Sequence, residues 1–329
     1  MSADPVSANS AKPVASVRDL VKIFKVSGDR GGAPLQLHAV NQVGFDIFAG
    51  ETLGLVGESG SGKSTIGRLL VGLIPPSSGS IDLFGKSITG RDGRRHLSNV
   101  RRRLQFVFQD PYGSLNPRMR VDDCIAEPLD IAGGLSRKDR ADRIIELLDI
   151  VGLPRSSRDR YPHEFSGGQR QRIGIARALA LRPEFIVCDE PVSALDVSMQ
   201  AQIVNLLLDL QDRFGLSYLF IAHDLAVVRS IARRVAVMYA GSIVEQGPKS
   251  EIYRAPRHPY TQALLDAVPR PDPERQRKPT LAGEIPSILH PLPGCAFATR
   301  CPLVTDRCRS ERPMPREIAA GHLVACHLA

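Results

Sequence analysis

The stretch Gly57-Glu58-Ser59-Gly60-Ser61-Gly62-Lys63-Ser64-Thr65 decides the fold of this chain, because it fits the phosphate-binding pattern G-x-x-x-x-G-K-[ST]. The apolar run 52–56 before it predicts a buried strand, and residues 66–71 after it predict a helix. Glycines allow the backbone to wrap tightly around a phosphate at the N-terminus of that helix. Lys63 is therefore expected to reach the β- and γ-phosphates of a nucleotide, and Ser64 to bind Mg²⁺.

The composition of the chain excludes few classes of protein. The chain has 329 residues, 43% of them hydrophobic, which is enough for one large domain with an appendage or for two domains. Its net charge of +8 suits nucleic acid, an anionic membrane surface or a nucleotide. Residues 1–13 are rich in Ser, Ala and Pro, predict disorder and lack the apolar core of a secretory signal. No run approaches the roughly 20 apolar residues of a membrane span, so we expect a cytoplasmic protein that reaches membranes through a partner.

The segments around the glycine loop predict an α/β architecture. Residues 14–26 and 35–48 are predicted to be strands, and alternating strands and helices over 51–223 predict a mostly parallel sheet covered on both faces. Phe24 lies on the first strand, where it can be a core aromatic or can stack on a nucleobase. The basic segment 91–103 is predicted to be a solvated face.

Several local signals mark element boundaries further along the chain. Ser136 resembles the start of a capping box, and Gly152 stops the helix that follows. A helix is predicted at 197–214. Residues 234–239 and 242–246 predict a hairpin.

Polar side chains follow three of the predicted strands at their C-terminal ends. Gln109, the pair Asp189 and Glu190, and His223 each occupy such a position. Ligands of open α/β sheets bind at these ends. Asp189 is suited to hold Mg²⁺ directly or through water, and Glu190 to polarise a water molecule.

A second anion site is predicted at Ser166-Gly167-Gly168-Gln169. Ser166 can cap a helix whose first turn carries two glycines, so backbone N–H groups are free to meet negative charge. A Ser-Gly-Gly helix start is a modest signal when taken alone.

In order and spacing, these segments resemble the motifs of an ABC transporter ATPase over about residues 14–250. Phe165 stands where Leu is commonest in that family's signature. The matching segments are the glycine loop 57–65 (Walker A), Gln109 (Q-loop), 165–169 (signature), 186–190 (Walker B with its catalytic Glu), 193–196 (D-loop) and His223 (H-loop).

The resemblance implies a P-loop NTPase fold of the ABC ATPase type. Its parts would be a RecA-like parallel-sheet core, an N-terminal antiparallel β subdomain, a helical signature subdomain over about 111–182 and a small C-terminal extension. The expected division of the chain is a disordered N-terminus at 1–13, the nucleotide-binding domain at 14–250 and a C-terminal domain at 251–329.

The resemblance also implies a mechanism. One subunit holds ATP and Mg²⁺, and the Ser166 helix of a partner subunit closes over the γ-phosphate. Glu190 would act as general base toward the attacking water, His223 would contact the γ-phosphate, and Gln109 would sense it. The residues expected to contact nucleotide also include Phe24, Gly167, Gly168, Gln169 and Asp196, and those expected around Mg²⁺ are Ser64, Gln109 and Asp189.

A narrower resemblance, to the oligopeptide/dipeptide permease branch, extends over nearly the whole chain. It rests on residues 109–119, 258–265 and 283–287 and on the cysteine spacing of the tail. It implies an ATPase subunit that powers uptake of di- or oligopeptides from the cytoplasmic face of the cell membrane. The partners implied are a second ATPase subunit, two transmembrane permease subunits and, indirectly, an extracytoplasmic peptide-binding protein. No nucleic acid is expected.

Four of the six cysteines lie near the C-terminus, separated by five, six and seventeen residues: Cys295, Cys301, Cys308 and Cys326. Disulfides are disfavoured in a reducing cytoplasm, and structural zinc usually takes paired C-x₂₋₄-C ligands, which this tail lacks. Four thiolates at irregular spacing also fit a 4Fe-4S cluster, which the resemblance to peptide permease ATPases implies as well. Zinc and unligated thiols stay open beside it. Cys124 and Cys188, in apolar surroundings, are predicted to be buried.

Other functional classes fit less well. A soluble ABC ATPase acting on ribosomes or DNA would suit the basic charge, but such proteins usually carry two cassettes or a long coiled-coil insert. A P-loop kinase or GTPase would not need the Ser-Gly-Gly-Gln helix start. The cargo (dipeptide, oligopeptide, glutathione or nickel chelate) and the identity of the partner ATPase, a copy or a paralogue, stay open.

Overall fold

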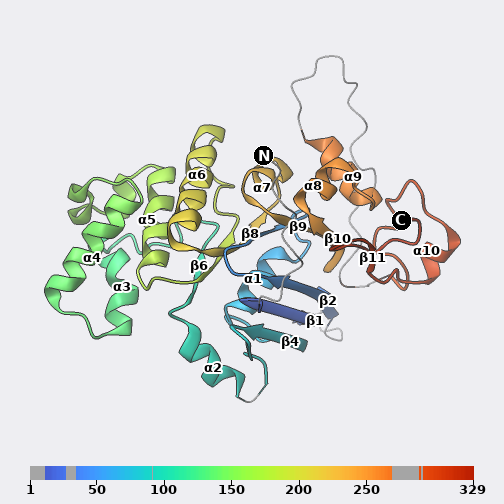
Figure 1. Cartoon of the computed structure of the whole chain (residues 1–329), viewed down its shortest axis with the longest axis horizontal. Coiled ribbons are helices and arrows are strands. Elements are labelled where there is room, and N and C mark those ends of the chain that lie inside the picture. The colour runs from blue at the N-terminus through green and yellow to red at the C-terminus, as the bar shows by residue number, and fades with distance from the viewer. Residues whose placement is uncertain (1–11, 27–34, 91, 269–288, 290–291) are drawn as a thin grey trace, which may run out of the picture.

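The computed structural model describes residues 12–26, 35–90, 92–268, 289 and 292–329, and Figure 1 shows their arrangement. The predicted disorder at residues 1–11 and the motif segment 283–287 lie outside these ranges. No helix within them is long and apolar enough to cross a membrane.

The N-terminal part forms a four-stranded sheet in the order β2-β1-β4-β5. Strand β1 pairs antiparallel with both β2 and β4, so that Ala15 lies opposite Ile47 on one side and Leu83 on the other. The strands span β1 (Ala15–Val26), β2 (Leu35–Ile47), β4 (Ser78–Leu83) and β5 (Lys86–Ser87).

The central sheet has eight strands in the order β11-β12-β10-β9-β3-β8-β7-β6, and β9 through β6 run parallel. In β8, Tyr218 and Phe220 belong to one hydrophobic core while Leu219 and Ile221 belong to a second. The parallel strands are therefore buried on both faces, as their continuous apolar runs require. The strands span β3 (Thr52–Val56), β6 (Leu104–Val107), β7 (Phe185–Asp189), β8 (Ser217–Ala222), β9 (Arg234–Tyr239), β10 (Ser242–Pro248), β11 (Arg316–Ala319) and β12 (His322–Val324).

Helices cover both faces of the central sheet. Helix α1 packs with the small sheet on one face, whereas α6 and α7 pack on the other, where α3, α4 and α5 form a separate group at the left of Figure 1. The helices span α1 (Lys63–Leu70), α2 (Gly93–Val100), α3 (Val121–Ala132), α4 (Arg137–Ile150), α5 (Gly167–Leu179), α6 (Val197–Phe214), α7 (Leu225–Ile231), α8 (Lys249–Arg254), α9 (Pro259–Ala267) and α10 (Asp306–Ser310).

The C-terminal region is joined to the central sheet. Strand β12 pairs with β10, where Glu245 lies opposite Val324, and β11 extends the sheet by pairing with β12. Tyr260 of α9 and Phe297 belong to the same hydrophobic core as the parallel strands. The described residues after 250 therefore pack against the nucleotide-binding part of the chain and extend its sheet.

The sheet arrangement confirms the predicted fold class, with an antiparallel N-terminal sheet, a parallel core and a helical group. The predicted cap is also confirmed, because Ser136 Oγ accepts the Asp139 N–H at 3.1 Å. The basic segment differs in part from expectation: it contains α2, which buries Leu97 and Val100 while its arginines stay exposed. Helix α1 begins at Lys63, three residues earlier than predicted.

Candidate nucleotide-binding site

The glycine loop lies between β3 and α1, and its conformation needs glycine at two positions in particular. Gly57 has φ 155° and Gly62 has φ 104°. A Cβ atom on Gly62 would lie 2.1 Å from the Ala39 carbonyl oxygen of β2, and one on Gly57 would lie 2.1 Å from the Met238 carbonyl oxygen of β9. The loop is therefore held against both sheets with no space for a side chain.

Lys63 is buried at the start of α1, with 4% of its surface exposed. Its Nζ donates to the carbonyl oxygens of Gly57 at 2.8 Å and Glu58 at 2.9 Å. Burial lowers the pKa of Lys63, and the nearby charges of Glu190 and Asp189 oppose that shift. The ammonium group thus lies at the helix N-terminus, where a phosphate would find both a positive charge and free N–H groups.

Ser64 and Asp189 bring two oxygen atoms together beside the loop. Ser64 Oγ donates to Asp189 Oδ1 at 2.8 Å, and Asp189 is almost fully buried at the end of β7. Burial raises the pKa of Asp189, while the Ser64 hydrogen bond lowers it. A hydroxyl and a carboxylate at this separation fit the oxygen preference of Mg²⁺, which would supply charge neutralisation on the phosphates.

Glu190, the residue after β7, carries its side chain out of the strand into a polar cluster. Its φ of 45° is left-handed, an uncommon conformation for a residue other than glycine. Its Oε2 accepts a hydrogen bond from Gln109 Nε2 at 2.9 Å and lies 3.4 Å from Nδ1 of His223. The structure therefore brings together three side chains that follow three different strands.

A cavity of about 810 Å³ contains these groups. Phe24 lines it, and stacking of its ring on a nucleobase stays a prediction. The sequence-predicted residues that line the cavity are Phe24, Ser59, Gly60, Gly62, Lys63, Ser64, Thr65, Gln109, Glu190 and His223. Sequence reasoning missed Leu37 and Ala39, which line the cavity and lie outside every motif. Three further lining residues belong to the segments 109–119 and 193–196 without having been predicted to contact nucleotide: Asp110, Ser193 and Ala194.

The predicted signature helix is formed as expected but does not line this cavity. Ser166 caps α5, since its Oγ accepts the Gln169 N–H at 3.4 Å and its own N–H donates to Gln169 Oε1 at 3.0 Å. A Cβ atom on Gly168 would lie 2.0 Å from Cε of Met199, so α5 passes close to α6 there. Within one chain, the Ser166 helix therefore lies outside the cavity that the glycine loop lines, and anion binding at Ser166 stays a prediction.

Asp196 caps the neighbouring helix α6. Its Oδ1 accepts the Met199 N–H at 2.9 Å, and this hydrogen bond lowers the pKa of the exposed Asp196 carboxyl. Its position in the structure is thus explained by capping, and contact with a nucleotide stays a prediction.

The four tail cysteines do not support the predicted metal cluster. Two of them are joined through the backbone, because the Cys295 N–H donates to the Cys308 carbonyl oxygen at 2.7 Å. Burial raises the pKa of Cys295 to about 11. Among the described residues, however, no three His, Cys, Asp or Glu side chains are arranged to hold a metal ion. Local groups contact two of the sulfur atoms instead: Thr305 Oγ1 lies 3.2 Å from Cys308 Sγ, and the Leu328 N–H donates to Cys326 Sγ at 3.4 Å.

The two remaining cysteines are buried, as predicted. Cys124 and Cys188 have 2% and 0% of their surface exposed, and burial raises the pKa of both. Neither thiol is suited to act as a nucleophile.

Comparison with known proteins decides the family. Residues 40–193 match the ABC transporter family model. Residues 244–308 match that of the oligopeptide/dipeptide transporter C-terminal region. The chain is 60% identical over 312 residues to a Brucella abortus protein provisionally named a peptide import ATP-binding protein, covering 94% of this chain and 92% of that protein. The chain belongs to the ABC transporter ATPase family. A Brucella ovis protein with the same provisional name is 50% identical, covering 95% of this chain and 97% of its relative.

Solved ABC structures share the fold. The ATP-binding cassette MJ0796, a dimer in a post-hydrolysis state with ADP and Pi, matches with a TM-score of 0.63 at 29% identity, covering 71% of this chain and 98% of that one. CbiO1 of Clostridium perfringens matches with a TM-score of 0.63 at 27% identity, covering 74% of this chain and 91% of its own. This ABC ATPase therefore binds and hydrolyses ATP, whereas the role of each named residue stays a prediction.

Proposed function

We propose that the chain is the ATP-hydrolysing subunit of an ABC importer that takes up di- or oligopeptides. The main support for this proposal is the pair of polar contacts that the Glu190 carboxylate makes with Gln109 and His223 beside the glycine loop. The peptide cargo is supported by the C-terminal match and by the names of the relatives.

In the proposed chemistry Lys63 binds the phosphates of ATP. Ser64 and Asp189 would hold Mg²⁺, which would neutralise charge on those phosphates. Glu190 accepts a proton from a water molecule whose oxygen attacks the γ-phosphorus, and the bond to the β-phosphate oxygen breaks to leave ADP and phosphate. His223 contacts the γ-phosphate. Gln109, which donates to Glu190, would sense Mg²⁺ and the γ-phosphate from the same position.

The second half of the site comes from another ATPase subunit, a copy or a paralogue. Ser166 and Gly168 of one subunit would meet the γ-phosphate bound by the other, because within one chain these residues do not line the cavity. ATP then bridges the two subunits, and hydrolysis removes the bridging contacts.

An adjoining groove of about 990 Å³, which shares Gln109 and Asp110 with the nucleotide cavity, suits the membrane partner. It runs from Gln109 to α3 and exposes two large apolar side chains, Phe108 at 42% and Ile131 at 82%. We assign this groove to a cytoplasmic helix of the permease, so that Gln109 connects the permease surface to the nucleotide. Two permease subunits and, through them, an extracytoplasmic binding protein complete the assembly at the cytoplasmic face of the membrane.

No step of this mechanism involves a metal cluster in the tail. The iron–sulfur and zinc alternatives drawn from the sequence lack support in the arrangement of the described side chains. Iron and zinc content of anaerobically purified protein decides between them and unligated thiols.

Reconstitution tests the proposal. The chain is co-expressed with candidate permease subunits and a candidate second ATPase subunit, and the complex is placed in vesicles with a candidate binding protein. ATP-driven accumulation of labelled peptide, lost on Lys63→Ala, is expected. A complex that hydrolyses ATP but transports no peptide of any length would refute the peptide cargo. A chain that never assembles with a permease would refute its role in an importer.

A further inference from the structure

A side chain of the C-terminal tail (residues 292–329) forms an ion pair with a residue of the glycine loop. Arg300 donates from Nη1 to Glu58 Oε2 at 2.7 Å and from Nη2 to Glu58 Oε1 at 3.0 Å. Only 5% of the Arg300 side chain is exposed, and 25% of the Glu58 side chain. Paired, bidentate geometry of this kind fixes orientation as well as charge. The ion pair joins residues 242 positions apart and belongs to neither the predicted catalytic set nor the predicted cysteine site.

A cluster of aromatic rings lies next to this ion pair. The rings of Tyr239, Tyr260 and Phe297 lie 4.6 to 5.5 Å apart by their centroids, and all three side chains are fully buried. Tyr260 also accepts the backbone N–H of Glu58 at 2.9 Å. Glu58 is therefore held through its backbone by α9 and through its carboxylate by the tail.

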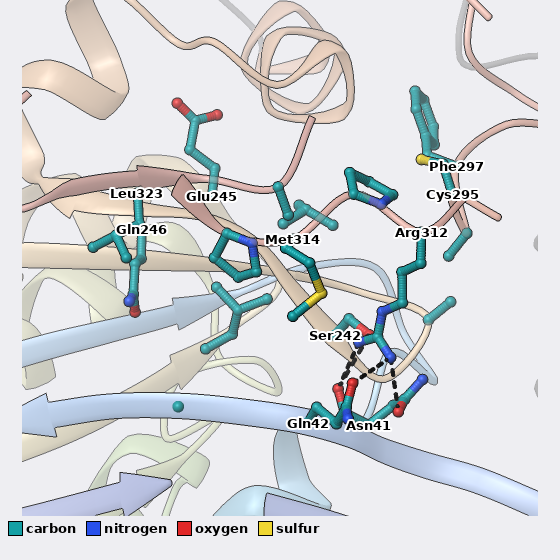
Figure 2. A pocket seen from close by; sticks show the side chains of 18 of the residues that line it. Asn41, Gln42, Ser242, Glu245, Gln246, Cys295, Phe297, Arg312, Met314 and Leu323 are labelled. Atoms are coloured by element: carbon teal, nitrogen blue, oxygen red, sulfur yellow. Dashed lines mark hydrogen bonds between the residues drawn. The ribbon is translucent and has the colours of Figure 1, made fainter. Parts of the chain in front are cut away.

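A second tail arginine reaches the strands that support the loop. Figure 2 shows Arg312 beside a cavity of about 300 Å³ between the tail and strands β2 and β10. Its guanidinium donates to Asn41 Oδ1 at 3.1 Å and to Ser242 Oγ at 3.1 Å. The neighbouring Gly241 donates its N–H to the carbonyl oxygen of Ser61 in the glycine loop at 3.0 Å. The tail thus contacts the loop directly at Glu58 and indirectly at Ser61, through Ser242 and the adjacent Gly241.

The negative charge of Glu58 acts electrostatically on Lys63, the lysine proposed to bind phosphate. Glu58 raises the pKa of Lys63 through space, and Lys63 Nζ donates to the Glu58 carbonyl oxygen at 2.9 Å. An unpaired carboxylate here would compete with a triphosphate for the ammonium group and repel it. Arg300 neutralises that carboxylate while leaving the cavity free, since neither residue lines it.

We propose that Arg300 is a positioning residue for ATP binding, through which the C-terminal tail sets the conformation and charge of the glycine loop. The inference rests on the proposed nucleotide site and goes beyond it, because it makes ATP affinity depend on how the tail is seated. Displacement of the tail would weaken ATP binding without any substitution in the glycine loop itself.

The test measures binding of a fluorescent ATP analogue, together with KM and kcat for ATP, in the assembled transporter. Arg300→Met keeps the length and apolar stem of the side chain and is expected to weaken binding about tenfold, equivalent to about 1.4 kcal/mol. The effect should appear in KM more than in kcat. Adding Glu58→Gln to this variant removes the uncompensated charge and is expected to restore most of the affinity.

Matched controls separate this effect from loss of folding. Arg307 makes a bidentate ion pair with Glu311 within the tail, at 2.8 and 2.9 Å, and Arg307→Met should leave ATP affinity unchanged. Glu58→Gln alone should bind ATP at least as tightly as the unaltered chain, a result that does not depend on whether Arg300→Met folds. Weaker binding by Glu58→Gln, or unchanged affinity in a folded Arg300→Met variant, would overturn the inference.

A further control distinguishes failure of this inference from failure of the proposed nucleotide site. Lys63→Ala should abolish binding. If it binds ATP normally, the proposed site itself is wrong. If it loses binding while Arg300→Met does not, only the role of Arg300 is refuted.

Discussion

Replacing Glu190 by glutamine removes one proton acceptor while keeping the shape of the site. In the structure the Glu190 carboxylate accepts from Gln109 Nε2 at 2.9 Å, and a glutamine carbonyl oxygen can accept the same hydrogen bond. The backbone conformation at φ 45° is equally strained for either residue, so the free energy of unfolding should change by less than about 0.5 kcal/mol. Loss of a general base typically costs about 10²- to 10⁴-fold in rate, which corresponds to about 2.7 to 5.4 kcal/mol of activation free energy.

The assay measures phosphate release and ATP binding on the same preparation of the assembled transporter. Glu190→Gln should bind Mg-ATP at least as tightly as the unaltered protein and release phosphate at least about 100-fold more slowly. Glu184→Gln is the matched control: Glu184 lies directly before the opposite end of β7 in an ion pair with Arg103, and its loss should leave kcat unchanged. Hydrolysis by Glu190→Gln at the normal rate would refute the assignment of Glu190 as base.

Three further changes test other parts of the account. Gly62→Ala would place a Cβ atom 2.1 Å from the Ala39 carbonyl oxygen, so urea unfolding should show a loss of at least about 2 kcal/mol, and ATP binding should fail. Asp189→Asn should abolish Mg²⁺-dependent hydrolysis yet raise the melting temperature of the nucleotide-free chain, because burial raises the pKa of Asp189 and so disfavours its charged form; an unchanged or lower melting temperature would contradict this. Burial lowers the pKa of His258 from 6.5 to about 4, so the unfolded chain binds this proton first and stability should fall by up to about 3 kcal/mol as pH drops from 6.5 to 4. His258→Asn, which can still cap α9, should flatten that slope in urea titrations at each pH, and an unaltered slope would assign the loss to other groups.

The regular elements were predictable because they depend on local sequence. Continuous apolar runs identified the buried strands β7 and β8. Helical periodicity and its capping residue identified α6. Helix α3 was not predicted. Pro128 lies inside it, and the helix is stabilised by packing of Val121, Ile125 and Leu129 in the hydrophobic core, which local propensity does not report.

The candidate site was predictable where motif spacing and strand ends define it. The gathering of Gln109, Glu190 and His223 follows from the rule that parallel strands present their C-terminal ends at one edge. The Glu58–Arg300 pair could not be predicted in this way, because it joins segments 242 residues apart with no shared periodicity. The cysteine spacing suggested a metal cluster, but sequence spacing alone does not determine how sulfur atoms are oriented in three dimensions.

In the proposed transporter, one subunit's glycine loop and another's Ser166 helix bind the same ATP molecule. The most direct measurement is a structure of the assembled transporter carrying Glu190→Gln, determined with Mg-ATP. We expect ATP between two ATPase subunits, with Lys63 of one and the Ser166 hydroxyl of the other both within hydrogen-bond distance of the γ-phosphate. ATP bound to a loop that faces solvent, with the Ser166 helix of every neighbouring subunit turned away, would contradict it.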